Sequence, residues 1–305
     1  MASITKIALV TDEQVGRVDR VVRALSGFSH RKLRGLFDHG CVRVNGEPCG
    51  DGGTRVGPGD RVEVSYDPQQ GYPEKKRAWA DAAFTIVFED QYLVVVNKAA
   101  NVLTVATERG GDEQTLVDRV SHYLKHTGRR REALVVHRLD RGVSGLLVFA
   151  KSQRMQRALQ EQFKKRKPDR RYIAIVAGIL PRAAGTFRSH LMTGKNLNQY
   201  STRNETQGEL AITHYQVQKR LADTTVVEVQ LETGRRNQIR VHFADHGHPV
   251  LGDPRYGHSK SRHERWPDDR IALHAASLGF VHPATGKPLR FESELPKSMQ
   301  RFMGR

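Results

Sequence analysis

The chain has 305 residues, of which 38% are hydrophobic and 27% charged, as is typical of a globular protein long enough for two domains. Lysine and arginine number 50 against 33 aspartates and glutamates, so the formal net charge is +17. This excess favours a polyanionic partner, first of all a nucleic acid. A membrane surface is disfavoured, because the sequence has no long apolar run and no strongly amphipathic basic helix.

The amino terminus, residues 1–15, has no apolar stretch of signal-peptide length and carries acidic residues early. We expect an extension there and a cytoplasmic protein. The two cysteines, Cys41 and Cys49, stand at a spacing that matches no zinc motif, and the 14 histidines form no ligand pattern. The sequence therefore predicts reduced thiols, no metal and no cofactor.

Residues 16–66 have the pattern of a separate small domain. Apolar residues recur at helical spacing from Val18 to Leu25, and Gly27 ends that helix. Ser29 offers the N-cap of a second helix, which Gly40 closes. A CVRV strand, a tight turn and a strand over 60–65 follow; the turn residues are Asn45 and Gly46.

Basic side chains crowd the start of the second helix: His30, Arg31, Lys32 and Arg34. Positive charge at a helix N-terminus opposes the helix macrodipole, so an anion bound there would relieve an unfavourable interaction. The helix therefore favours a role in binding nucleic acid.

A polar stretch without periodicity, residues 67–83, predicts a linker to a larger domain over 84–305. Strands are expected at 84–90, 91–98, 146–150, 171–178, 224–232 and 271–281. One helix is expected at 112–126, stopped by Gly128, and a second from the Ser152 cap through residue 163. A third is expected within residues 234–247 and ends at Gly247. Helices and mostly antiparallel strands occur in separate groups, which favours the α+β class.

The segment from Val136 to Lys151 places one carboxylate, Asp140, between two cations, Arg138 and Arg141, ahead of an apolar strand. A carboxylate held at the edge of a core beside permanent cations is expected to stay ionised, as a nucleophile must be. The alternative is an aspartate that only forms a structural salt bridge at the start of a strand.

A second basic run, Lys164 to Arg171, leads directly into Tyr172 and contains only one acid, Asp169. It can be a solvated face or a set of phosphate contacts.

Three segments resemble motifs of the RluA-type RNA pseudouridine synthases, which isomerise uridine to pseudouridine in RNA. HRLDRGVSGLL resembles H-R-L-D-x-x-T-S-G-L-L, RRYIAIVAG resembles (K/R)-x-Y-x-A-x-V-x-G, and residues 232–257 resemble T-G-R-x-H-Q-I-R-V-H-x-x-x-x-G-H-P-I-x-G-D-x-x-Y-G. The resemblance implies that Asp140 is catalytic, that Tyr172 packs against the target base and is a candidate proton acceptor, and that Arg240 pairs with Asp140. It also implies that Arg138 fills the space that the target uridine leaves; the alternative is that Arg138 only bonds neighbouring backbone.

Residues 18–49 and 56–64 resemble the S-four RNA-binding domain, named after a ribosomal protein. This likeness implies RNA contacts by Arg31, Lys32 and Arg34. Together the resemblances imply an α+β protein: a mixed, mainly antiparallel sheet with flanking helices, plus a small α+β RNA-binding domain.

The chain departs from the family pattern at three places. Val143 replaces a usual threonine, Asn237 replaces a common histidine, and residues 97–101 read NKAAN where N-K-P-A-G is usual. None of these changes Asp140, Tyr172 or Arg240, so they bear on substrate choice.

The sequence thus favours a monomeric, cytoplasmic RNA pseudouridine synthase that acts on large-subunit ribosomal RNA. Alternatives are a synthase for transfer RNA and a non-catalytic RNA-binding ribosome-assembly factor. A hydrolase that uses Asp140 would lack a suitably placed second carboxylate and a metal-binding cluster.

Overall fold

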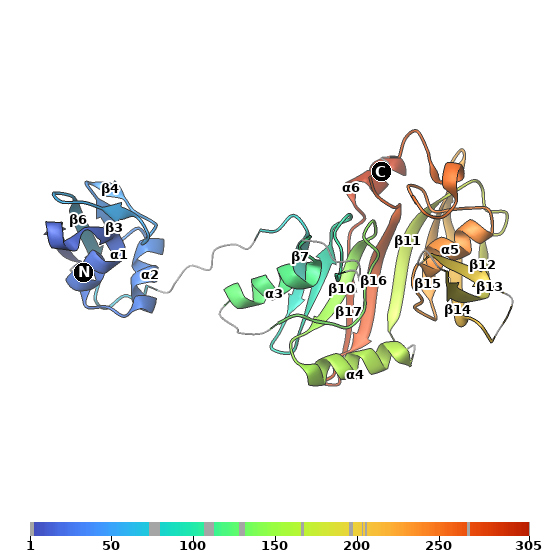
Figure 1. Cartoon of the computed structure of the whole chain (residues 1–305), viewed down its shortest axis with the longest axis horizontal. Coiled ribbons are helices and arrows are strands. Elements are labelled where there is room, and N and C mark those ends of the chain that lie inside the picture. The colour runs from blue at the N-terminus through green and yellow to red at the C-terminus, as the bar shows by residue number, and fades with distance from the viewer. Residues whose placement is uncertain are drawn as a thin grey trace. The chain divides into compact units, whose positions relative to one another are not determined.

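The computed structural model describes residues 3–72, 80–106, 113–127, 132–165, 168–194, 198–202, 204, 206–266 and 269–304, without the side chains of His30, Arg31 and His258. Some predicted features lie outside the described residues: part of the linker at 73–79, Gly128, Arg166, Lys167 and the side chain of Arg31. The chain forms two compact units, residues 1–79 and 80–305 (Figure 1). No described helix is long and apolar enough to cross a membrane.

The small unit packs two helices against short strands. Its elements are β1 (Ile4–Leu9), η1 (Asp12–Gln14), β2 (Gly16–Arg17), α1 (Val18–Ser26), α2 (His30–Asp38), β3 (Val42–Val44), β4 (Glu47–Pro48), β5 (Arg55–Val56) and β6 (Arg61–Tyr66). As predicted, α1 ends at Gly27, which adopts φ 72° and donates its N–H to the carbonyl of Arg23. Buried Val18, Val22, Leu36 and Val62 form part of the core.

The amino-terminal extension predicted for residues 1–15 contributes a strand to the small unit. β1 pairs antiparallel with β6, from Ile4 opposite Tyr66 to Leu9 opposite Arg61, and so becomes the edge strand of the sheet β1-β6-β3-β4. The sequence did not indicate this strand, because its apolar residues Ile4, Ile7 and Leu9 are all exposed and follow no alternating pattern of burial. Backbone pairing, which leaves no alternating burial pattern in the sequence, holds this strand.

The large unit is built on one long sheet with helices on its flanks (Figure 1). Its elements are β7 (Phe84–Glu89), β8 (Leu93–Lys98), α3 (Leu116–His126), β9 (Leu134–Val135), β10 (Ser144–Ala150), α4 (Gln153–Lys164), β11 (Asp169–Ala177), β12 (Ala184–Thr193), β13 (Gln199–Thr202), β14 (Glu209–Arg220), β15 (Thr224–Leu231), α5 (Gln238–Asp245), η2 (His258–Ser261), β16 (Leu273–Val281), β17 (Pro288–Glu292) and α6 (Lys297–Phe302).

The strand order is β13-β12-β14-β15-β11-β16-β10-β8-β7, with β17 beside β16 and β9 beside β10. Within the described sheet, β10 and β16 form the one parallel pair and the other pairings are antiparallel. The predicted α+β class with a mixed, mainly antiparallel sheet is confirmed. α4 packs against β9 and β10, and α5 packs against β13 and β14.

The strands β12, β13, β14 and β17 were not expected from the sequence. The residues of β12, β13 and β14 mix polar with apolar side chains and show no regular period of burial, whereas β17 alternates regularly but over only five residues. The start of α3 also differs: the helix begins at Leu116 rather than near residue 112, because Thr115 and Asp118 form a capping box there.

The strand after the HRLD segment is buried along its whole length, as its apolar sequence predicted. β10 lies between β8 and β16, where Gly145 adopts φ 119° and approaches the backbone of Ala275. A Cβ built on Gly145 would lie 2.4 Å from the carbonyl oxygen of Ala275, so only glycine allows this approach. The loop that carries Asp140 therefore enters the middle of the sheet.

Candidate active site

The loop before β10 is fixed by backbone and side-chain hydrogen bonds. The Thr104 hydroxyl donates to the carbonyl of Leu139 at 2.8 Å and accepts the N–H of the same residue at 3.3 Å. The carbonyl of Asp140 accepts the N–H of Val143 at 3.1 Å. These bonds hold the backbone of Asp140, whose side chain stays 22% exposed.

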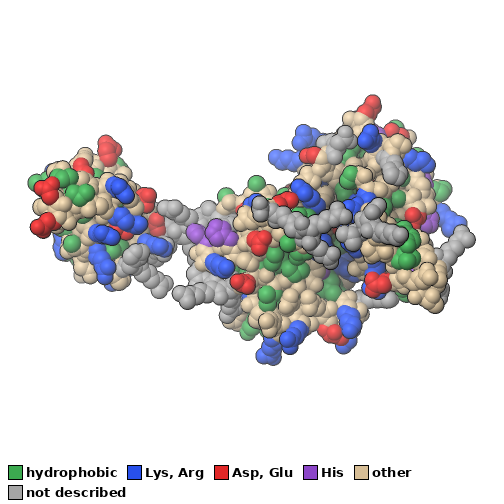
Figure 2. All heavy atoms as spheres, viewed as in Figure 1, with side chains coloured by type: hydrophobic (Ala, Val, Ile, Leu, Met, Phe, Trp, Pro, Cys, Tyr) green, Lys and Arg blue, Asp and Glu red, His purple; other side chains and the backbone are tan. Residues whose placement is uncertain are grey.

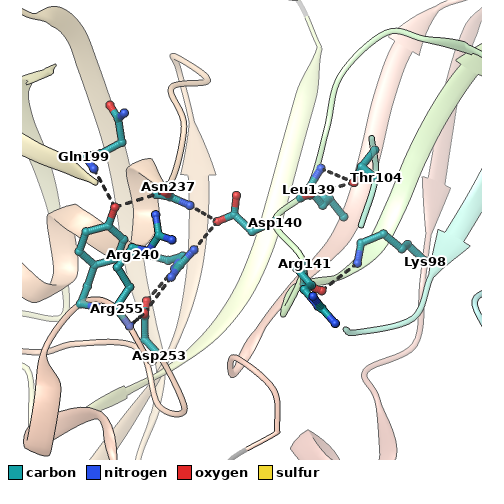
Figure 3. Close-up of polar contacts among 11 residues, drawn as sticks. Lys98, Thr104, Leu139, Asp140, Arg141, Gln199, Asn237, Arg240, Asp253 and Arg255 are labelled. Atoms are coloured by element: carbon teal, nitrogen blue, oxygen red, sulfur yellow. Dashed lines mark hydrogen bonds and ion pairs between the residues drawn. The ribbon is translucent and has the colours of Figure 1, made fainter. Parts of the chain in front are cut away.

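Arg240, on α5, joins two carboxylates (Figure 3). Its Nη1 lies 2.8 Å from Oδ2 of Asp140, while Nε and Nη2 contact the two oxygens of Asp253 at 2.7 and 2.8 Å. Asp253 is fully buried, and the guanidinium is 7% exposed. Burial lowers the pKa of Arg240, but the hydrogen bond to Asp253 and the charge of Asp140 outweigh it, so the net pKa is raised.

Asn237 contacts the same oxygen of Asp140. Its side-chain Nδ2 donates to Oδ2 at 2.5 Å, next to the bond from Arg240. Oδ1 of Asp140 accepts no hydrogen bond from the residues that the structure describes (Figure 3). One oxygen is thus anchored twice, and the other keeps its lone pairs for a ligand.

Tyr172 lies on β11, in the middle of the sheet, with 7% of its surface exposed. Burial raises the pKa of its phenol; nearby Arg170 opposes the rise, and the charge of Asp140 adds to it. The hydroxyl is therefore protonated near neutral pH. This favours the ring as a packing surface and disfavours the tyrosine as a proton acceptor.

The two residues before Leu139 have different surroundings. Arg138 is exposed and makes no hydrogen bond or ion pair within the described part of the chain, so the alternative of a backbone-bonded arginine finds no support. His137 accepts the N–H of Val148 at 3.2 Å and stacks on Phe163 with ring centroids 4.5 Å apart. Burial lowers the pKa of His137 to about 3, which fits the predicted structural role.

The basic run before Tyr172 divides into residues with different partners. Arg171 pairs with Asp169 at 3.4 Å and with Glu228 at 3.2 Å, and Lys165 pairs with Glu161 at 3.2 Å. Arg170 is only 8% exposed, its guanidinium lies 5.5 Å from the ring centroid of Phe163, and its Nε has no hydrogen-bond partner. The run is not a uniform solvated face.

Lys98, which sequence reasoning did not select, contacts the loop that carries Asp140. It is 1% exposed, and its Nζ donates to the carbonyls of Ala99 and Val102 at 2.8 Å each and of Arg141 at 3.2 Å. Burial lowers the pKa of Lys98 to about 7; the charge of Asp140 opposes this, and that of Arg270 adds to it. The available signal was a lysine at the end of β8, whose first four residues are all apolar.

Asp253 and Tyr256 were also missed, although both stand in the quoted G-D-x-x-Y-G motif. Tyr256 lies under Arg240, with the guanidinium 5.0 Å from its ring centroid, and its hydroxyl lies 3.2 Å from Oδ1 of Asn237. No group of three or more histidines, cysteines or acids is placed to hold a metal in the described ranges.

The predicted RNA-binding residues of the small unit lie on α2. Lys32 and Arg34 are exposed, and the ammonium of Lys32 lies 5.4 Å from the ring centroid of Phe28. The first turn of α2 contains no acid, and Ser29, at the N-cap position, makes no side-chain capping bond. Figure 2 shows several lysine and arginine side chains close together on the visible face of this unit.

Comparison with known proteins identifies the family. A family model described as RNA pseudouridylate synthase matches residues 92–245. The chain belongs to this family of RNA-modifying isomerases. A second model, described as S4 domain, matches residues 16–62, so this pseudouridine synthase carries the S-four RNA-binding domain expected from its sequence.

Relatives match the synthase along nearly its whole length. The ribosomal large subunit pseudouridine synthase D of Zymomonas mobilis is 35% identical and covers 97% of this chain and 96% of its own. The protein of the same name from Vibrio cholerae is 33% identical over 95% and 91%. The solved human RNA pseudouridylate synthase domain containing 4 has the same fold, with a TM-score of 0.59 at 24% identity over 72% of this chain and 91% of that one.

Proposed function

We propose that this protein converts specific uridines of large-subunit ribosomal RNA to pseudouridine. The observation that carries the proposal is the state of Asp140: Oδ2 is held by Arg240 and Asn237, while Oδ1 has no described partner. The ribosomal substrate is supported by the names of the relatives from Zymomonas mobilis and Vibrio cholerae.

The reaction rearranges one nucleoside. The bond from N1 of uracil to C1′ of ribose breaks, the base turns, and C5 joins C1′; a proton leaves C5, and N1 ends with a proton. The reaction adds no atom and oxidises no group, so its stoichiometry requires no cofactor. Oδ1 of Asp140 either adds to the sugar or base, or removes a ribose proton. Arg240 keeps the carboxylate in place, and Tyr172 packs against the loose base.

RNA contacts are assigned to both units. Arg138, exposed and without a partner among the described residues, is positioned on the loop of Asp140 to enter the stack when the target uridine leaves it. In the small unit, Arg31, Lys32 and Arg34 on α2 bind phosphates. We propose that residues 84–305 form the catalytic domain, and that the RNA-binding domain extends the predicted range 16–66 by including β1.

The chain is proposed to act as a monomer in the cytoplasm, without a membrane. Asp140, Tyr172, Arg240 and Arg138 all belong to one unit of one chain, so the site needs no residue from a second copy. Transfer RNA is the second candidate substrate, since the active-site geometry by itself does not depend on which RNA presents the uridine.

The test is pseudouridine formation in uridine-labelled RNA without added cofactor. Wild-type protein is expected to modify a large-subunit ribosomal transcript and not transfer RNA. Asp140→Asn replaces the carboxylate with an amide of nearly the same shape, so it should abolish turnover while RNA affinity and melting temperature stay close to wild type. Turnover by Asp140→Asn above a small fraction of wild type would show that Asp140 is not the catalytic residue. Modification of transfer RNA but not of the ribosomal transcript would show that transfer RNA is the substrate.

A further inference from the structure

Asn237 is placed to control which oxygen of Asp140 reacts. Its Nδ2 lies 2.5 Å from Oδ2, the oxygen that Arg240 also holds at 2.8 Å. With two donors on Oδ2, rotation of the carboxylate about its Cβ–Cγ bond would break both bonds. The donors therefore fix Oδ1 as the oxygen that faces a substrate.

The orientation of the Asn237 amide follows from its neighbours. The backbone N–H of Gln199 can only donate, and it lies 2.9 Å from the hydroxyl oxygen of Tyr256. The hydroxyl oxygen accepts this hydrogen bond from Gln199, and the O–H donates a hydrogen bond to Oδ1 of Asn237, 3.2 Å away. The NH₂ group of Asn237 is then left to donate to Asp140, whose carboxylate only accepts.

The backbone of Asn237 supports the same arrangement. The residue adopts φ 55° directly before α5, in the left-handed region where asparagine is among the few tolerated side chains. It is 9% exposed, so water does not compete strongly for its amide. Both the backbone conformation and the burial restrict the position of the Asn237 side chain.

We propose that Asn237 is a positioning residue for the catalytic carboxylate, and that the Tyr256 hydroxyl acts through it. The inference rests on the proposed function, because it assigns Oδ1 of Asp140 as the reacting atom. The chain of hydrogen bonds runs from the backbone of β13, through Tyr256 and Asn237, to Asp140 (Figure 3). The Tyr256 ring also packs on Arg240, so its ring and its hydroxyl have separate tasks.

The main variant is Asn237→Gly, because glycine keeps the left-handed backbone without strain and removes only the amide. We expect kcat to fall roughly 10- to 100-fold with KM nearly unchanged, as a misplaced reacting group produces. Asn237→Asp should fall further, because it places a second carboxylate against Oδ2. The matched control is Asn45→Gly, an exposed asparagine at φ 53° in the small unit, which contains none of the proposed catalytic residues; it should keep its turnover on a short stem-loop.

Tyr256→Phe tests the relay, because it keeps the ring over Arg240 and removes only the hydroxyl. It should lower kcat by a smaller factor than Asn237→Gly does. The double variant Asn237→Gly with Tyr256→Phe should be no slower than Asn237→Gly alone, since the hydroxyl acts only through the lost amide. Independent, multiplying losses would overturn the relay, and wild-type kcat in Asn237→Gly would overturn the positioning role.

A thermal double-mutant cycle needs no substrate. The melting-temperature shifts of Asn237→Gly and Asp140→Ala should be non-additive, because each removes the same hydrogen bond. Additive shifts would contradict the contact itself. If the cycle is non-additive and wild-type protein modifies no ribosomal RNA, the proposed substrate fails while the Asn237–Asp140 pairing stands.

Discussion

At the scale of single residues, the centre of the site is a cation between two carboxylates rather than one ion pair. The sequence predicted that Arg240 pairs with Asp140, and the structure shows that pair at 2.8 Å. It adds Asp253, which is fully buried and binds Arg240 through both of its oxygens. Asp253 orients the guanidinium, so that Nη1 is the group presented to Asp140.

This arrangement makes Arg240→Ala costly, by about 3–5 kcal/mol in the free energy of unfolding, because it leaves the buried carboxylate of Asp253 with backbone hydrogen bonds but no opposite charge. The buried partner is Asp253, whereas Asp140 is 22% exposed. Adding Asp253→Asn to Arg240→Ala should therefore restore more stability than adding Asp140→Asn. Denaturant unfolding of the three variants measures this, and equal recovery by the two second changes would contradict the assignment.

Lys98 gives the site a pH-dependent stability. Burial lowers its pKa from 10.5 to about 7 in the folded protein. Between these values the unfolded chain binds more protons than the folded one, so the free energy of unfolding rises with pH, by at most about 1.4 kcal/mol per pH unit. Below pH 7 both states are protonated and this contribution is constant.

Lys98→Met should remove that slope. The difference in unfolding free energy between wild type and Lys98→Met is expected to shift in favour of wild type as pH rises from 7 to 10. Urea denaturation at fixed pH values measures the difference. Stability curves that run parallel over this range would show that Lys98 keeps its ordinary affinity for protons.

At the scale of elements, the parallel contact between β10 and β16 sets the position of the loop that carries Asp140. Ser144 and Gly145 lie opposite His274 and Ala275, at the start of β10 and only a few residues after Asp140. The Ser144 hydroxyl lies 2.8 Å from Nδ1 of His274 and accepts from Arg270 at 3.0 Å. The two strands are thus joined by side chains where backbone pairing is short.

Gly145→Ala should disrupt this contact. The added Cβ would lie 2.4–2.8 Å from backbone atoms of Ala275, at φ 119°, so overlap and backbone strain combine to cost about 3 kcal/mol or more. Gly247→Ala is the matched control: its φ is 80° and nothing lies within 4 Å, so only strain of about 1–2 kcal/mol is expected. Similar melting temperatures for the two variants would contradict the close approach.

At the scale of the whole molecule, we propose that the two units divide the work of binding RNA and modifying it. The small unit has its own core and carries the basic start of α2, while Asp140, Tyr172 and Arg240 all lie in the large unit. On this proposal the net charge of +17 favours binding by both units, because lysines and arginines that contact phosphates release counterions from the RNA.

Deleting residues 1–79 tests this division. The remaining unit should fold and keep turnover on a short stem-loop, but bind long ribosomal RNA more weakly. Its affinity should also depend less on salt, since each lost phosphate contact lowers the log–log slope by roughly 0.7–0.9. In the full chain, Lys32→Gln with Arg34→Gln should reproduce part of the change. An unchanged slope in both would assign the small unit to protein contacts instead.

Much of this protein could be predicted from its sequence, wherever the chemistry is local. α1 with its Gly27 end, the Ser152 cap, the buried β10 and the α+β class follow from periodicity, capping and turn residues that act within a few positions. Asp140, Tyr172 and Arg240 could be selected because each stands in a contiguous motif. The exposed β1 and the half-buried β12 to β14 could not, because long-range backbone pairing, which leaves little trace in side-chain order, forms them.

Only the tertiary structure decided how the selected residues act together. Lys98, Asp140 and Asp253 are far apart in the chain, and no spacing in the sequence shows that Lys98 binds the loop of Asp140 or that Asp253 holds Arg240. Asn237 could be recognised in the sequence only as a departure from a motif, whereas its bond to Oδ2 requires the left-handed turn before α5 to meet the start of β10. The residue types that set the chemistry are a local property of the sequence; the choice of reacting oxygen depends on directions and distances that exist only once the sheet has formed.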